Sequence, residues 1–212
     1  MPTPPRHRLA LAAGLAVVGL LLAVGTAWVF TPALAGLFDG LRALGGAGVD
    51  ELPPAEGVPP EVPAASQAAV VDRVVDGDTV RVTVDEAGGP IAPTDSIRIR
   101  LLNVDAPELD HPDRGEDCGA AEATAFVEAL TPPGSTVYLV PDVEDRDRYG
   151  RPLRGVWNEE GRFVNAELVL AGWAEVVLFE PNDRFHGELL GLEVQARSEG
   201  RGAWASCGGF PP

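Results

Sequence analysis

Short apolar and β-branched stretches alternate with turn-forming residues along the second two-thirds of the chain. Residues 68–75 and 79–84 are rich in valine and flank Asp76-Gly77-Asp78, an arrangement typical of a β-hairpin. Residues 97–104 alternate apolar and polar side chains, which predicts a third strand. The same signals predict two further strands, at residues 135–140 and 153–158.

Three other segments have the spacing of amphipathic helices. Residues 120–130 place apolar side chains at helical intervals, and Pro132-Pro133-Gly134 ends this helix. Residues 163–171 predict a second helix, which Gly172 ends, and residues 184–198 predict a third. This order of elements is that of an α+β protein. We therefore expect a five-stranded β-barrel of the OB type with about three helices, although periodicity alone does not prove that the barrel closes.

The N-terminal pattern is different, because residues 9–30 form an uncharged stretch of 22 residues. That length suffices to cross a bilayer and exceeds the usual core of a signal peptide. The small-x-small sequence at residues 33–35 is nevertheless typical of a signal peptidase site. Residues 1–35 are therefore expected to be a signal anchor or a cleaved signal peptide. Because Arg6 and Arg8 precede the stretch, both alternatives place the rest of the chain outside the cytoplasm, anchored to the membrane or secreted.

A linker is expected to join this segment to the folded domain. Residues 50–66 are rich in Pro, Glu and Ala, a composition that favours an extended, semi-rigid spacer. We assign residues 36–66 to the linker and residues 67–212 to one folded domain, which is expected to be monomeric.

The charge of the chain excludes a broadly basic nucleic-acid binder. The formal net charge is -16, and all 16 cationic side chains are arginine, since the sequence contains no lysine. A protein that binds long nucleic acid through its whole surface should be basic. Any chemistry on phosphate must therefore depend on a small local group of arginines and metal.

The chain contains two cysteines, Cys118 and Cys207. Two cysteines are too few for a zinc ribbon, and they lack metal-ligand spacing. In an exported domain they would form one disulfide that closes a long loop, and two free buried thiols are the alternative.

Two carboxylates flank Gly77 in the turn between the first two predicted strands. Asp-Gly is favoured in hairpin turns that need a positive φ, so Asp76 and Gly77 alone require no functional explanation. Such a turn does not require Asp78 as well. A second carboxylate here offers the hard oxygen ligands that Ca²⁺ or Mg²⁺ prefers.

A second polar group lies at residues 100–108. If the third strand is continuous, even-numbered residues from Arg100 to Val104 face one way and odd-numbered residues from Leu101 to Asp105 face the other. Arg100 has apolar neighbours, and a buried guanidinium must be paired or must bind an anion. A proline-containing turn then presents Glu108. A salt bridge followed by a solvated turn is the alternative.

A charged turn at residues 147–151 precedes the fifth predicted strand. Charged turns are usually only solvated. Together with Arg100, however, Arg151 could hold phosphate oxygens in a bidentate way.

These three segments resemble the staphylococcal (micrococcal) nuclease, or thermonuclease, family. The motifs are VDGDTV at residues 75–80, RLLNVDAPE at 100–108 and DRYGR at 147–151, in the family's order and approximate spacing. The resemblance spans about residues 68–204 and implies an SNase-like OB-fold domain. Further matches lie at His111-Pro112, residues 119–126, Val164-Asn165 and Pro181-Asn182.

The resemblance implies a calcium site. Asp78 and Asp105 match the family's calcium-binding carboxylates, and Ala106 matches the residue that provides a backbone carbonyl. Asp76 would be a carboxylate close behind these ligands. Because the Ala106 ligand belongs to the main chain, its side chain should matter little.

The resemblance also implies catalytic roles for three residues. Glu108 matches the residue usually regarded as the general base, and Arg100 and Arg151 match the two arginines that stabilise the phosphate. A divalent ion and two guanidiniums would neutralise the charge that develops on the phosphoryl oxygens.

The resemblance implies a calcium-dependent nuclease, a hydrolase that cleaves DNA or RNA and leaves 3′-phosphate ends. We expect single-stranded substrates to be favoured. The family's nucleotide-flanking tyrosines have no clear match at residues 176–179, where we expect Phe179 to be a core residue rather than a base-stacking one. The loop after Glu108 is acidic, with Asp110, Asp113, Glu116 and Asp117. The alternatives are a catalytically silent OB-type binding module and a surface protein with a purely structural calcium ion.

Overall fold

The computed structural model describes residues 61–85, 89–110, 112–113 and 115–210. The predicted membrane or signal segment and most of the predicted linker lie outside these residues. Within the described part of the chain, no helix is both long and apolar enough to cross a membrane.

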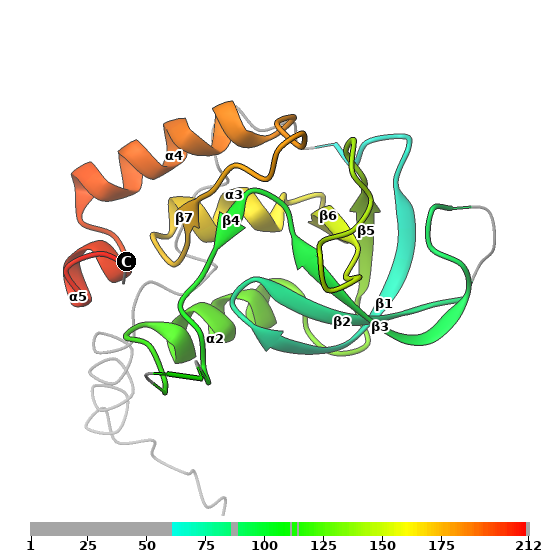
Figure 1. Cartoon of the computed structure of the whole chain (residues 1–212), viewed down its shortest axis with the longest axis horizontal. Coiled ribbons are helices and arrows are strands. Elements are labelled where there is room, and N and C mark those ends of the chain that lie inside the picture. The colour runs from blue at the N-terminus through cyan, green and yellow to red at the C-terminus, as the bar shows by residue number, and fades with distance from the viewer. Residues whose placement is uncertain (1–60, 86–88, 111, 114, 211–212) are drawn as a thin grey trace, which may run out of the picture. The chain divides into compact units, whose positions relative to one another are not determined.

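Five strands form a closed barrel in the order β1-β2-β3-β6-β5 (Figure 1). Neighbouring barrel strands are antiparallel, except that β3 and β6 pair in parallel, with Arg100 opposite Leu153. The barrel predicted from the sequence is thus confirmed, and its closure, which periodicity could not prove, is present. The strands are β1 (Gln67–Asp76), β2 (Thr79–Val84), β3 (Thr94–Leu101), β5 (Thr136–Val140) and β6 (Leu153–Asn158).

Strand β1 pairs with both β2 and β5, and its ladder with β2 is irregular. The register with β2 shifts between Val71 and Arg73 and again between Val74 and Asp76. Such irregularities bend a strand and increase its twist, which closing a small barrel requires. The inward-facing positions of β2 are fully buried valines, Val80, Val82 and Val84.

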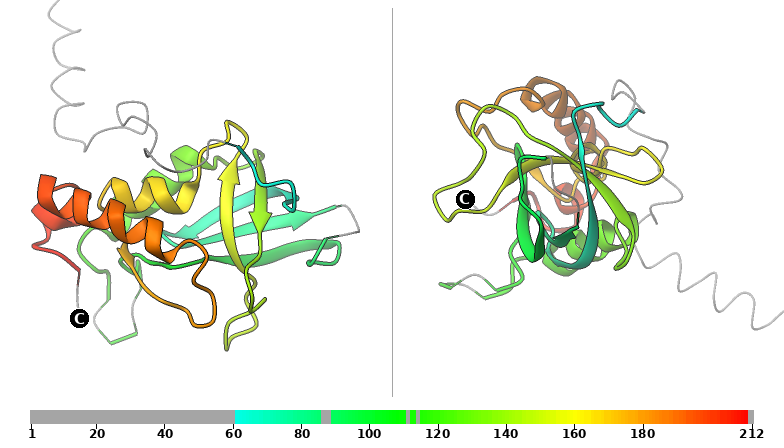
Figure 2. Two further views of the ribbon diagram at one scale, coloured as in Figure 1. Left: turned by 90° about the horizontal axis from the view of Figure 1, so that it is seen from above. Right: turned by 90° about the vertical axis from the view of Figure 1, so that its right-hand side faces the viewer.

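The described residues contain four helices rather than the three predicted: α2 (Ala120–Leu130), α3 (Val164–Leu170), α4 (His186–Glu199) and α5 (Ala203–Ser206). The additional helix, α5, is a single turn, too short to produce a periodic pattern. Figures 1 and 2 show the helices gathered on one side of the barrel. Helix α2 contacts β1, and α3 contacts β6. Every residue of β6 is buried, because this strand faces both the barrel interior and α3.

The third strand ends earlier than predicted. Strand β3 stops at Leu101, and Asn103 adopts a positive φ of 59°, which turns the chain. Residues Val104–Asp105 then form β4, which pairs with β7 (Glu175–Val176) in a separate two-stranded sheet. The predicted alternation across residues 100–105 is therefore wrong. The turn brings the side chains of Arg100 and Asp105 together, although a continuous strand would separate them.

Candidate active site

The turn between β1 and β2 places Asp78 inside the protein, with 4% of its surface exposed. Its carbonyl accepts a hydrogen bond from the Leu101 backbone at 2.8 Å. Its Oδ1 accepts the Thr79 hydroxyl at 3.0 Å, and its Oδ2 accepts the Ala106 N–H at 3.1 Å. The Asp78 carboxylate is therefore fixed by β3 and by the segment that follows β4.

Gly77 is required in this turn for space. It is not among the described residues with positive φ, so the expected conformational reason for glycine does not apply. A Cβ at this position would lie 2.6 Å from the Ala106 Cβ and 2.8 Å from the Ala123 Cβ. Glycine thus allows the turn to pack directly against α2 and against the segment that carries Asp105 and Ala106.

Arg100 connects Asp78 and Asp105, the two carboxylates for which the family resemblance implies metal binding. The side chain is 5% exposed and its Nη1 donates to the carbonyls of Leu101 and Val104, at 2.9 and 2.6 Å. Its Nη2 lies 2.6 Å from Asp105 Oδ1 and 3.0 Å from Asp78 Oδ2. The buried guanidinium is therefore paired, and it holds Asp78 and Asp105 on one side of the site.

The carboxylates of the site repel one another. Burial, together with the negative charges of Asp78 and Glu108, raises the pKa of Asp76 to about 7. The pKa of Asp105 is also raised by desolvation and by these same neighbours, against the opposing effect of Arg100. Four carboxylates, including exposed Glu108, thus influence one another electrostatically across the site.

The donor set suits a hard divalent cation. Asp78 and Asp105 offer carboxylate oxygens and Ala106 a main-chain carbonyl, and about 52% of the Asp105 side chain is exposed. Added positive charge would relieve the repulsion that raises the carboxylate pKa values. Among the described residues, no group of three or more His, Cys, Asp or Glu side chains is arranged to hold a metal. A cation bound here would therefore depend on two carboxylates, the carbonyl and water.

Glu108 is positioned through its backbone. Its side chain is exposed, whereas its N–H donates to Asp117 Oδ2 at 3.1 Å and its carbonyl accepts the Asp117 N–H at 2.9 Å. Asp117 is 7% exposed. The sequence grouped Asp117 with the acidic loop residues, but the structure gives it a structural function at the end of that loop.

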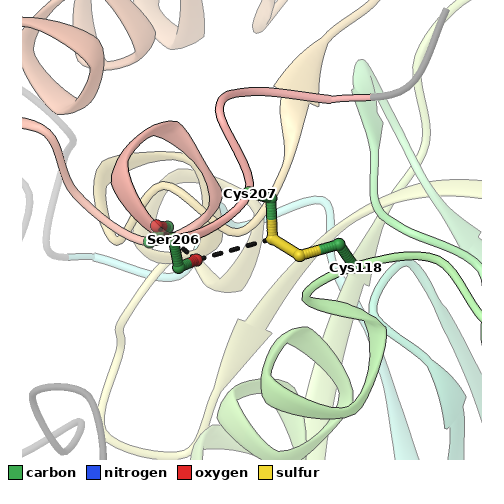
Figure 3. Close-up of a disulfide and its surroundings, with 4 residues drawn as sticks. Cys118, Ser206 and Cys207 are labelled. Atoms are coloured by element: carbon green, nitrogen blue, oxygen red, sulfur yellow. Dashed lines mark hydrogen bonds between the residues drawn. A yellow bond between two sulfur atoms is a disulfide. The ribbon is translucent and has the colours of Figure 1, made fainter.

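The next residue, Cys118, forms a disulfide with Cys207, and their Cα atoms are 5.8 Å apart (Figure 3). The bond joins the segment before α2 to the segment after α5. Ser206 lies beside it, with its Oγ 3.5 Å from Cys207 Sγ. The described residues contain no free cysteine.

The turn that presents Arg151 is organised by Asp147. Its Oδ1 accepts the backbone N–H groups of Tyr149 and Arg151, each at 2.9 Å, and its Oδ2 accepts Arg151 Nε at 2.6 Å. Partial burial opposes ionisation of Asp147, but these hydrogen bonds prevail and lower its pKa. Because Asp147 uses only the Nε of Arg151, the two terminal nitrogens can serve an anion.

A cleft of about 590 Å³ lies between this turn and the segment after β7. Arg100 lies 5.4 Å from the centre of the Phe179 ring, and Arg148 and Arg151 lie 4.8 and 5.5 Å from that of Tyr149. Phe179 is thus a partly exposed cleft residue, and the expectation that it belongs to the core is wrong. The residues of the cleft that matter most for chemistry are Arg100, Asp105, Tyr149, Arg151 and Phe179.

Several buried polar residues that hold the site together received no role from the sequence. Asn103 Nδ2 donates to the Asn182 carbonyl at 2.9 Å, and Asn182 Oδ1 accepts the Glu144 N–H at 2.7 Å. Fully buried Arg154 donates to the Asp145 carboxylate at 2.5 Å and to its carbonyl at 3.0 Å. These contacts attach the loop before β6, which carries Arg151, to the rest of the domain. A polar residue inside an otherwise apolar strand, as at Arg154, is the signal that could have revealed one of them.

The sequence model of the family described as staphylococcal nuclease homologue matches residues 98–206. The chain therefore belongs to the staphylococcal nuclease homologue family. The matched segment contains Arg100, Asp105, Glu108 and Arg151, whereas Asp78 precedes it.

Individual relatives align over about two thirds of the chain. Endonuclease YhcR of Bacillus subtilis (strain 168) is 31% identical over 142 residues, which are 64% of this chain and 11% of that much longer protein. An uncharacterized endonuclease of Escherichia coli O157:H7 is 35% identical over 142 residues, 67% of this chain and 80% of that protein. The thermonuclease of Staphylococcus intermedius is 30% identical over 139 residues, 65% of this chain and 76% of that protein.

Proposed function

We propose that this chain is a Ca²⁺-dependent endonuclease that hydrolyses phosphodiester bonds of DNA or RNA and leaves 3′-phosphate ends. The observation that carries the proposal is the network of Asp78, Arg100 and Asp105 beside a cleft that Arg151 also lines. Metal-assisted phosphodiester hydrolysis combines acidic ligands for a cation with positive side chains that stabilise the phosphate, and this network offers both. Relatives named endonuclease and thermonuclease support the same class of activity.

Asp78, Asp105 and the Ala106 carbonyl would hold the calcium ion. When bound, the ion supplies positive charge that polarises a phosphoryl oxygen and lowers the cost of bringing water to an anion. Arg100 orients Asp78 and Asp105 and also presents positive charge to the cleft. Arg151 binds a phosphoryl oxygen through its terminal nitrogens while Asp147 holds its Nε.

Glu108 orients the attacking water and accepts its proton. Its negative charge raises the pKa values of Asp76 and Asp105, which indicates that Glu108 lies near the proposed cation ligands. Its exposed side chain is accessible to solvent water. Correct alignment of one water with the phosphorus is the contribution that in-line attack requires of this residue.

A single strand is the substrate that the cleft favours. Tyr149 is 68% exposed and Phe179 is partly exposed, so both rings can stack on unpaired bases. The net charge of -16 repels long duplexes, and we expect weak binding to duplex DNA at low salt.

An extracytoplasmic location completes the proposal, with the domain anchored to the membrane or secreted. The uncharged N-terminal stretch after Arg6 and Arg8 supports this location. The Cys118–Cys207 disulfide also supports it, because such bonds persist in oxidising compartments.

The test is cleavage of single-stranded DNA by the full chain, with CaCl₂ or with EDTA, at several salt concentrations. Glu108→Ala and Arg151→Ala should each lower kcat by at least ~100-fold, in line with the loss of a catalytic acid–base group or charge stabiliser. Arg197→Ala is the matched control, since Arg197 is exposed on α4 and does not line the cleft. Absence of cleavage by folded, calcium-bound protein would instead favour a binding module or a structural calcium site.

A further inference from the structure

The loop that begins at Glu108 is closed by Asp117. Two backbone groups of Glu108 form hydrogen bonds with Asp117. The Glu108 N–H donates to the Asp117 carboxylate, and the Glu108 carbonyl accepts the Asp117 N–H. The carboxylate of Asp117 is buried, whereas the side chain of Glu108 is exposed. The backbone of Glu108, whose carboxylate is exposed, is therefore fixed by the buried residue Asp117.

Asp117 is itself held from two directions. Its carbonyl accepts the Ala120 N–H at 3.1 Å, at the first turn of α2. Its neighbour Cys118 is bonded to Cys207, and Gly119 adopts a left-handed conformation in which a Cβ would lie 3.5 Å from Cys207 Sγ. The disulfide thus fixes the chain next to Asp117.

The other end of the disulfide is also anchored. The Ala203 N–H, at the start of α5, donates to the Gly172 carbonyl at 2.9 Å. The two backbones approach so closely at this point that a Cβ on Gly202 would overlap the Gly172 carbonyl. Cys207 is therefore attached to the end of α3, and this attachment extends through the disulfide to the Glu108 loop.

We propose that Asp117, held by the Cys118–Cys207 disulfide, is a positioning residue that fixes Glu108 for catalysis. The proposal rests on the proposed nuclease function and deepens it. Asp117 does not touch substrate; it acts by fixing the backbone from which the Glu108 side chain extends. Displacement of a water-orienting carboxylate by ~1 Å can cost about 100-fold in rate. Binding of phosphate by Arg100 and Arg151 does not depend on this contact.

A double-mutant cycle in the full chain tests the coupling. Asp117→Ala removes the acceptor for the Glu108 N–H and should lower kcat at least ~10-fold with little change in KM. Asp117→Asn retains an oxygen that can accept this hydrogen bond and should restore most of the rate. In a Glu108→Gln background, Asp117→Ala should have little further effect. An equal loss in both backgrounds would overturn the proposal, because a general structural defect acts independently of Glu108.

Removing the disulfide tests the second part. The double variant Cys118→Ser/Cys207→Ser should lower kcat in the same way, with KM retained, and the effect should again vanish in the Glu108→Gln background. Unchanged kcat in a folded disulfide-free variant would show that Asp117 does not need the disulfide.

A measurement without substrate separates this proposal from the proposed function. Hydrogen exchange followed by mass spectrometry should show slow exchange of the Glu108 amide in the wild-type chain. Exchange should be faster in Asp117→Ala and in the disulfide-free variant. If the wild-type chain does not cleave but shows this exchange pattern, the proposed nuclease function is wrong, whereas the positioning of Glu108 by Asp117 is supported. If the Glu108 amide exchanges equally fast in all three proteins, the positioning role is overturned regardless of activity.

Discussion

The two halves of the candidate site are held in different ways. Asp78 and Arg100 are almost fully buried and are bonded to the backbone of strands and turns in the barrel. Glu108 is exposed and Arg151 is partly exposed, and each depends on one aspartate for its position, Asp117 or Asp147. The buried half therefore belongs to the folding core of the domain, whereas the exposed half is attached to its surface.

This difference separates the effects of mutations on stability from their effects on activity. A change in the buried half should lower both, because a buried charge that loses its partner is costly. A change in the exposed half should lower activity alone, since a partly exposed ion pair contributes little to folding.

Replacing the two arginines tests this separation most directly. Arg100→Leu leaves Asp78 and Asp105 without their shared cation and should reduce the free energy of unfolding by about 3–5 kcal/mol. Arg151→Leu breaks only the Asp147 pair and should cost less than ~1 kcal/mol. Urea denaturation in EDTA measures both. Equal losses would mean that the two halves do not differ as described.

Gly77→Ala should have an intermediate effect. The added methyl group must displace Ala106 or Ala123, and such overpacking costs about 1–3 kcal/mol. The shift should also reduce the proposed calcium-dependent cleavage, because Ala106 and Asp78 belong to the same candidate site. Gly187→Ala on α4 is the control, since a Cβ there meets no atom within 4 Å and should leave stability unchanged or slightly higher. Thermal melting of both variants provides the comparison, and equal destabilisation would contradict the packing argument.

A further expected effect concerns the pH dependence of the stability of the metal-free protein. The pKa of Asp76 is about 7 in the folded chain against 3.8 ordinarily, so the folded state binds more protons between these values. This contribution to stability is complete below the unfolded pKa and is lost as the pH rises through 7. Asp76→Asn should therefore raise the melting temperature by a few degrees at pH 8 in EDTA, and by less at pH 5.

Asp147→Asn provides the opposite case. The pKa of Asp147 is lowered in the folded chain, so its contribution is present above the ordinary pKa and is lost as the pH falls through the folded value. Asp147→Asn should therefore lower the melting temperature slightly at pH 7, and this effect should disappear in acid. Circular dichroism melts across pH 3–8 measure both variants, and parallel curves would contradict the assigned pKa shifts.

Much of the barrel could be predicted because its signals are local. Helix α2 and strands β2 and β6 begin and end at the predicted residues. The break after β3 was not predicted. The Asn103 side chain at this break donates hydrogen bonds to the Asn182 and Val177 carbonyls, which lie far along the sequence. Helix α5 was missed because a single turn has no periodicity.

The candidate site was predictable to a different degree. Arg100 and Arg151 line one cleft, and Glu108 influences the pKa values of Asp76 and Asp105. Motif resemblance predicted catalytic roles for all three residues. It did not reveal which residues support them. Asp117 resembled its acidic neighbours in the sequence, and only its burial and its bonds to Glu108 distinguish it.

The parallel contact between β3 and β6 has a consequence for the order of folding. The turn with Asp78 and the strand with Arg100 belong to consecutive antiparallel strands, β1 to β3, which can form early because their contacts are local. Arg151 arrives beside them only when β6 pairs with β3, after a long loop has closed. During refolding, we therefore expect the part of the site that contains Asp78 and Arg100 to assemble first. Cleavage should return only when β6 pairs with β3 and closes the barrel.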